Sequence, residues 1–260
     1  MSSPENPPSR EWLHAGRSAV SMYGNFFFWL FREPFPSRQI GQQIIRVMLE
    51  AVGVMVVAAI VEGGLFAWLA GWYSRKFSFI SWAGAGSAYM LLTEATTMIG
   101  AMIFAARIGT AFTVEIGSMQ MSGQLDALRL MAVEPVQFIV IPRVLASILS
   151  LVVLKALSDG VAILASMLAA RWWFDIAFNV FLQHVFQILA HPILTTSYVR
   201  CAILAFFISL NGCGLGFYFT GGAIELGKTT TKSIVINLLT VITVDSIYGV
   251  IDSLTGWSVL

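Results

Sequence analysis

The chain has 260 residues, of which 57% are apolar and 11% are charged, and its mean hydropathy is +0.80. Soluble domains carry about 25% charged residues, so this composition indicates an integral membrane protein. The formal net charge of +1 argues against nucleic acid as a partner.

Residues 1–43 precede the predicted permease-like membrane domain, which we place at residues 44–260. Residues 1–10 are rich in proline and serine and are expected to be disordered. Residues 11–33 combine an aromatic helical face with flanking arginines, which predicts an amphipathic helix lying in the membrane interface. Only Phe26–Phe31 is continuously apolar, and that length covers roughly 9 Å of a hydrocarbon core about 30 Å thick.

Five later segments are apolar and long enough to cross a bilayer as helices. They are residues 44–72, 85–111, 136–170, 198–219 and 233–254. Residues 171–195 predict an interfacial or extramembrane helix, and residues 220–232 predict a polar loop. The predicted fold class is therefore an all-α integral membrane protein with five transmembrane helices.

Residues 117–133 join the second and third spans and predict a short amphipathic helix. Its apolar positions recur near helical spacing: Met119, Leu125, Leu128 and Met131. Pro135 ends it, because proline disfavours helical geometry in the preceding residue. Such a helix either binds a soluble partner or only ties two spans together, and the pattern alone leaves both open.

Five spans place the two termini on opposite sides of the membrane. An inside N-terminus gives ten basic residues inside and four outside, as the positive-inside rule favours. The inner set is Arg10, Arg17, Arg32, Arg38, Arg46, Arg107, Arg129, Arg143, Lys228 and Lys232, and the outer set is Arg75, Lys76, Arg171 and Arg200. Residues 117–133 would then be cytoplasmic and the C-terminus external.

Several ionisable residues lie within the predicted spans. Lys155 and Asp159 are four residues apart, so they can form an intramembrane ion pair, for which we favour a structural role. Glu94 has no cation within four residues and is expected to pair across spans or to face a wet cavity. Asp245 and Asp252 share one helical face, where capping or pairing near the outer end is expected.

Residues 222–229, GAIELGKT, match the phosphate-loop pattern. That motif needs a preceding strand and an α/β core, whereas a membrane span precedes it here, so we interpret it as a cytoplasmic turn in which Lys228 binds no nucleotide. Cys201 and Cys213 are interpreted as packing residues. The three histidines lack metal-ligand spacing, so neither a cofactor nor a metal is expected in this chain.

Two stretches resemble the signature of the MlaE/YrbE permease family. The first comprises residues 105–109 (AARIG), 115–119 (EIGSM) and 124–128 (QLDAL) with Pro142-Arg143; the second is residues 216–223 (GFYFTGGA) with Thr230-Thr231. Both occur in the family's order and at similar separation, and the similarity runs from about Ile44 to Ser253.

The resemblance implies a permease subunit of an ATP-binding cassette (ABC) transporter in the bacterial cytoplasmic (inner) membrane. It implies transport of lipids, phospholipids first among them, to or from an MCE-type protein on the outer face. Members pair as dimers, so a second permease subunit, identical or related, is expected. A separate cytoplasmic ATPase would bind ATP and Mg, so this chain would not itself be an enzyme.

Two sets of site residues follow from the resemblance. The expected ATPase contacts are Glu115, Gln124, Asp126 and Arg129, and the expected wall of the lipid cavity is Phe66, Tyr73, Phe77, Tyr89 and Glu94. Two positions depart from the family: Thr93 stands where an arginine is often found, and Gly123 stands where many members have a glutamate. Roles of those two family residues therefore do not carry over.

Two other classes compete with this interpretation. One is a proton-coupled secondary transporter that uses Glu94, Lys155, Asp159 and Asp245 as a relay. Such transporters commonly show inverted repeats, and the two halves of this sequence show none. The other is a membrane scaffold without transport. A co-purifying ATPase would favour the ABC transporter, and proton-driven flux without ATP would favour the secondary transporter.

Overall fold

The computed structural model describes residues 22–29, 37–77, 83–189 and 193–255. All regular elements in these ranges are helices. Five of the helical stretches are long and apolar enough to cross a membrane, which confirms the predicted fold class. The predictions for residues 1–10 and for most of 11–33 lie outside the described residues; within them, residues 22–29 are helical.

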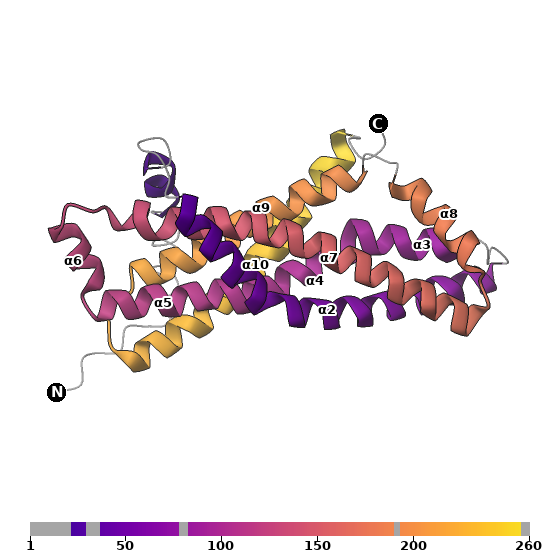
Figure 1. Cartoon of the computed structure of the whole chain (residues 1–260), viewed down its shortest axis with the longest axis horizontal. Helices are drawn as coiled ribbons and strands as arrows, with labels where there is room; N and C mark the ends of the chain where they lie inside the picture. The colour runs from indigo at the N-terminus through magenta and orange to yellow at the C-terminus, as the bar shows by residue number, and fades with distance from the viewer. Residues whose placement is uncertain (1–21, 30–36, 78–82, 190–192, 256–260) are drawn as a thin grey trace.

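The five spans form an elongated bundle (Figure 1). The first is α2 (Ser37–Lys76), and the second joins α3 (Ala83–Met90), η2 (Leu91–Ala95), α4 (Thr96–Phe104), η3 (Ala105–Gly109) and α5 (Thr110–Met121). The third joins η4 (Val136–Val140) and α7 (Ile141–Phe174), and the last two are α9 (Ile193–Phe217) and α10 (Ala223–Thr255). The shorter helices α6 (Gln124–Leu130) and α8 (Phe178–Leu189) lie at opposite ends of the bundle.

Small residues allow the spans to approach closely, as in other membrane helix pairs. A side chain at Gly63 of α2 would collide with the backbone of α7 at Ala162, and one at Gly212 of α9 would collide with Gly109 of η3. The main apolar core is shared by α2, the second span, α7 and α9 and contains Phe104, Ile108 and Leu154. Large apolar side chains such as Val57 and Leu164 remain more than half exposed on the outside, as a lipid-facing surface requires.

Helix ends differ from the sequence prediction at two places. The predicted amphipathic helix over residues 117–133 is two helices, because Gly123 adopts a left-handed conformation (φ 73°) between α5 and α6. The predicted loop over residues 220–232 is wrong from Ala223 onward, where α10 begins. There Glu225 accepts a hydrogen bond from the Gly222 amide at 3.1 Å, which caps the helix.

The segment after the third span is also divided differently. α7 continues to Phe174, beyond the predicted end at residue 170, and Asp175 then adopts a left-handed conformation (φ 58°) that ends the helix. α8 follows as a separate amphipathic helix. It packs Phe181 and Val185 against a small apolar cluster with α3 and the end of α7, so it covers one end of the bundle rather than extending the third span.

Candidate functional site

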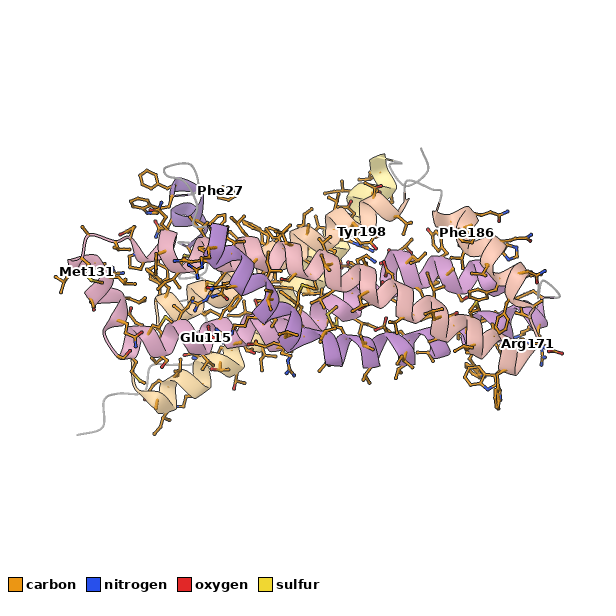
Figure 2. All side chains as sticks on the ribbon, in the orientation of Figure 1. Phe27, Glu115, Met131, Arg171, Phe186 and Tyr198 are labelled. Atoms are coloured by element: carbon orange, nitrogen blue, oxygen red, sulfur yellow. The ribbon has the colours of Figure 1, made fainter. Side chains whose placement is uncertain are left out.

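Helix α6 presents a largely exposed surface at one end of the bundle. Leu125, 1% exposed, anchors it to the core, whereas Leu130 is 90% and Met131 is 65% exposed. Asp126 and Arg129 pair with each other at 2.8 Å on the solvent side. Figure 2 shows Met131 at the α6 end and Arg171 at the opposite end of the bundle. Three predicted ATPase contacts, Gln124, Asp126 and Arg129, therefore share one short exposed helix.

Glu115, the fourth predicted ATPase contact, lies one helix earlier, on α5. Its carboxylate accepts a hydrogen bond from Arg143 of η4–α7 at 3.0 Å and another from Arg46 of α2. Arg46 also bonds Glu50 at 3.0 Å. The carboxylate thus links three spans just behind α6, and its contact with an ATPase stays a prediction.

Lys155 and Asp159 form the predicted intramembrane pair, with Nζ to Oδ2 at 3.0 Å and both side chains buried. Lys155 also donates to the Leu92 carbonyl and to Thr96 Oγ1, each at 3.2 Å. Asp159 accepts from Thr96 at 2.5 Å and from Tyr198 at 3.0 Å. Four polar neighbours fix this pair between the second span, α7 and α9, which agrees with a structural role.

Glu94 pairs across spans, as one of its two predicted alternatives required. Arg200 of α9 donates to its carboxylate at 3.0 and 3.2 Å and also bonds the Thr93 carbonyl. Asp245 of α10 lies 3.4 Å from the same guanidinium. The Arg200 side chain is 5% exposed and that of Glu94 is 55% exposed, so the ion pair is half covered and half open.

Arg200 and Arg143 therefore correct one premise of the topology prediction. Both were counted as charges near the membrane surface, yet each lies buried in the bundle and holds a carboxylate. Removing them takes one basic residue from each side of the count, so the predicted inside N-terminus keeps its support.

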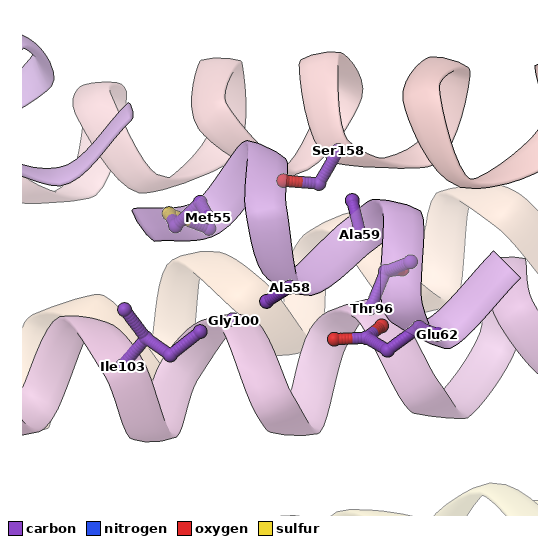
Figure 3. A pocket seen from close by; sticks show the side chains of 8 residues that line it. All are labelled: Met55, Ala58, Ala59, Glu62, Thr96, Gly100, Ile103 and Ser158. Atoms are coloured by element: carbon purple, nitrogen blue, oxygen red, sulfur yellow. The ribbon is translucent and has the colours of Figure 1, made fainter. Parts of the chain in front are cut away.

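The predicted lipid wall is not gathered into one pocket. Tyr73, Phe77 and Tyr89 are 45–62% exposed, whereas Phe66 packs against the small core cluster around Leu91. Neither these four nor Glu94 lines the pocket shown in Figure 3. Any lipid cavity that they border must be completed by something other than the described part of this chain.

The pocket in Figure 3 lies among α2, α4 and α7 and was not predicted from the sequence. Its lining consists of Met55, Ala58, Ala59, Glu62, Thr96, Gly100, Ile103 and Ser158. Glu62 is 6% exposed, and its Oε2, like Ser158 Oγ, has no hydrogen-bond partner. An acidic residue in an apolar segment was the available signal, but its isolation depends on three helices that meet only in the fold.

The phosphate-loop pattern has no phosphate-loop structure. Residues 223–229 form the start of α10, and α9 precedes them, so both neighbours of Gly222 are membrane helices. Thr229 and Thr230 donate to backbone carbonyls four residues earlier at 2.9 and 2.8 Å. Without a strand or a glycine-rich cradle, these residues cannot arrange backbone amides around phosphates.

Taken together, the helices and buried ion pairs define a multi-pass membrane protein whose polar groups are enclosed within the bundle, with a short helix exposed at one end. Comparison with known proteins gives its family. The family described as "Permease MlaE" matches residues 40–251. The chain belongs to this family, which confirms the resemblance seen in the sequence.

The relatives are named as permeases from several lineages. The chain is 26% identical to "Protein TRIGALACTOSYLDIACYLGLYCEROL 1, chloroplastic" of Arabidopsis thaliana, over 92% of this chain and 68% of the relative. It is 31% identical to "Probable ABC transporter permease protein ycf63" of Pyropia yezoensis over 66% of each chain. It is 26% identical to "Probable ABC transporter permease protein slr1045" of Synechocystis sp. over 88% of each.

The chain is therefore an ABC transporter permease, the non-catalytic membrane subunit that works with a separate ATPase. This family does not support the secondary-transporter or scaffold alternatives.

Proposed function

We propose that this chain is the lipid-conducting permease subunit of an ABC transporter in the bacterial cytoplasmic membrane. A cytoplasmic ATPase drives it, and an MCE-type protein on the outer face exchanges phospholipids with it. Family membership supports this proposal, as does the Arabidopsis relative, whose name refers to a galactolipid.

The half-open Glu94–Arg200 pair is the observation that carries the lipid part of the proposal. An ionised side chain facing hydrocarbon costs a few kcal/mol, so such groups turn toward protein or water. Glu94 is nevertheless 55% exposed in this single chain. We infer that a second permease subunit covers this face and encloses a wet cavity, with Tyr89 on its apolar wall and Glu94 near the lipid headgroup.

Lipid transfer by the reconstituted transporter tests this assignment. Glu94→Gln should lower transfer about tenfold or more, while the ATPase still co-purifies, because the substitution removes charge from the cavity and leaves α6 intact. Glu225→Gln is the matched control, since Glu225 is an exposed carboxylate at the start of α10. Unchanged transfer by Glu94→Gln would show that this carboxylate does not contact the transported lipid.

Helix α6 is the proposed docking element for the ATPase. Its exposed Leu130 and Met131 offer apolar contacts, and the Asp126–Arg129 pair offers charges of both signs. Exchanging the charges, Asp126→Arg with Arg129→Asp, keeps the pair within α6 but reverses what a partner meets. The ATPase should then be lost on purification while the permease stays folded.

The opposite end of the bundle supplies the control for this experiment. Arg171 and Asp175 form another exposed ion pair, four residues apart, at the far end. Exchanging those two charges should leave the ATPase bound. Wild-type recovery of the ATPase with the α6 exchange would contradict docking through this helix. Mass spectrometry of the complex from native membranes would identify the lipid, the second permease and the MCE-type partner.

A further inference from the structure

Glu62 differs from the other acids enclosed by the bundle because it lacks a cation. Its side chain projects from α2 into the pocket toward Thr96, with Ser158 on the facing helix α7 (Figure 3). Glu62 Oε2 and Ser158 Oγ are both buried and without a hydrogen-bond partner. A buried polar group without a partner costs about 1–3 kcal/mol, and more if it is charged.

The nearest ammonium group cannot neutralise Glu62. Lys155 has three N–H donors, and they are taken up by Asp159 at 3.0 Å and by the Leu92 carbonyl and Thr96 at 3.2 Å each. Its charge is matched by Asp159. An ionised Glu62 would therefore leave one uncompensated negative charge in the bundle.

The other elements around the pocket add no positive charge. Titratable groups close to Glu62 are Lys155 and Asp159 on α7, and Tyr198 on α9 reaches Asp159 from behind at 3.0 Å. α4 contributes only Thr96, Gly100 and Ile103 to the pocket lining.

The size of the pocket restricts what can complete the site. It has about 160 Å³ of space between atoms, but nowhere is it wide enough for a water molecule. A metal ion or an ammonium headgroup would need still more room. A proton needs none, removes the charge, and turns one carboxylate oxygen into a donor for neighbouring acceptors such as Ser158 Oγ.

We propose that Glu62 is a proton-binding site that is occupied while α2 packs on α4 and α7, and that it releases the proton when α2 moves away. In the separated arrangement water reaches the carboxylate, so ionisation there is favourable. Rising pH therefore favours separation of α2 from its neighbours, by up to tenfold in the ratio of the two arrangements per pH unit for one proton. The site regulates helix packing and does not drive transport.

Infrared spectroscopy of the full-length permease in lipid nanodiscs tests occupancy directly. A protonated carboxyl carbonyl band should be present near neutral pH, should shift in deuterium oxide, and should be absent from Glu62→Gln. Ser158→Ala should shift its frequency without removing it, because one hydrogen-bond partner is lost. Asp245→Asn and Glu225→Gln should leave the band unchanged. A band that persists in Glu62→Gln, or no such band in the folded wild type, would overturn the proposal.

Thermal unfolding at several pH values tests the consequence for packing. The wild type should lose stability as pH rises above neutrality, whereas Glu62→Gln, which stays neutral and keeps an N–H donor, should lose this dependence. Equal pH dependence in both proteins would contradict the regulatory role. Neither measurement involves lipid transfer, so both outcomes are independent of the proposed transport function.

Discussion

Two adjacent glycines on α2 provide a sharp test of how the first and third spans pack. A Cβ atom at Gly63 would meet the carbonyl oxygen of Ala162, lie 2.8 Å from Ala165 Cβ and lie 3.0 Å from the backbone nitrogen of Ser166. A Cβ atom at Gly64 would meet nothing within 4 Å. The two positions share a helix and differ only in the face that they present.

Gly63→Ala should destabilise the protein because its new methyl group collides mainly with backbone, which cannot rotate aside. Overpacking of this kind costs about 1–3 kcal/mol. Gly64→Ala has free space and should be neutral or stabilising by up to about 1 kcal/mol, through helix propensity. The two variants should therefore differ by roughly 1–4 kcal/mol.

Unfolding in mixed micelles, followed by far-ultraviolet circular dichroism during a titration with denaturing detergent, measures this difference. The double variant should behave as the sum of the two, unless α2 moves as a unit. If Gly63→Ala is as stable as Gly64→Ala, α2 and α7 do not approach as closely as the structure indicates. The same result would weaken the enclosure of Glu62, which is the preceding residue.

Three further outcomes are expected. Lys155→Met should destabilise by about 3–5 kcal/mol because Asp159 is left buried and unpaired, and adding Asp159→Leu should recover much of the loss in the same unfolding assay; no recovery would argue against charge pairing as the cause. Lys228→Ala should leave ATP hydrolysis by the assembled complex nearly unchanged, and a large loss would reopen nucleotide binding at residues 222–229. A cysteine at Ser2 should escape a membrane-impermeant maleimide in intact cells, since both native cysteines are buried; labelling there would place the N-terminus outside.

The spans were predictable because their signal is local. A run of about 20 apolar residues indicates a membrane helix wherever its neighbours lie, and all five predicted spans occur as helices. Helix ends depended on finer features. The start of α10 was missed because the polar residues at positions 228–232 suggested a loop. Thr229 and Thr230 instead bond carbonyls of their own helix, which places polar side chains in a helix without unpaired hydroxyls.

The partners of the buried charges were only partly predictable. Lys155 and Asp159 lie on one helix, so their spacing alone indicated the pair. Glu94 meets Arg200 across 106 residues of sequence, and the local pattern around either residue carries no trace of the other. The same limitation misplaced Arg200 on the outer surface, because a basic residue near the end of a span looks the same in sequence whether it faces lipid headgroups or a buried carboxylate.

Charge balance gives the two buried clusters a common feature. One contains Lys155 with Asp159 and Glu62, and the other contains Arg200 with Glu94 and Asp245. Each therefore has two carboxylates for one cation. The first is closed and too narrow for water, so a proton is the occupant that balances it without moving a helix.

The second cluster is open at Glu94, whose side chain is 55% exposed, and Thr93 stands beside it where related permeases often carry an arginine. On the proposed function, the missing positive charge is supplied from the cavity. A lipid with a cationic headgroup would then bind more strongly here than in relatives that keep the arginine, because its ammonium group replaces a charge that those relatives supply from their own chain.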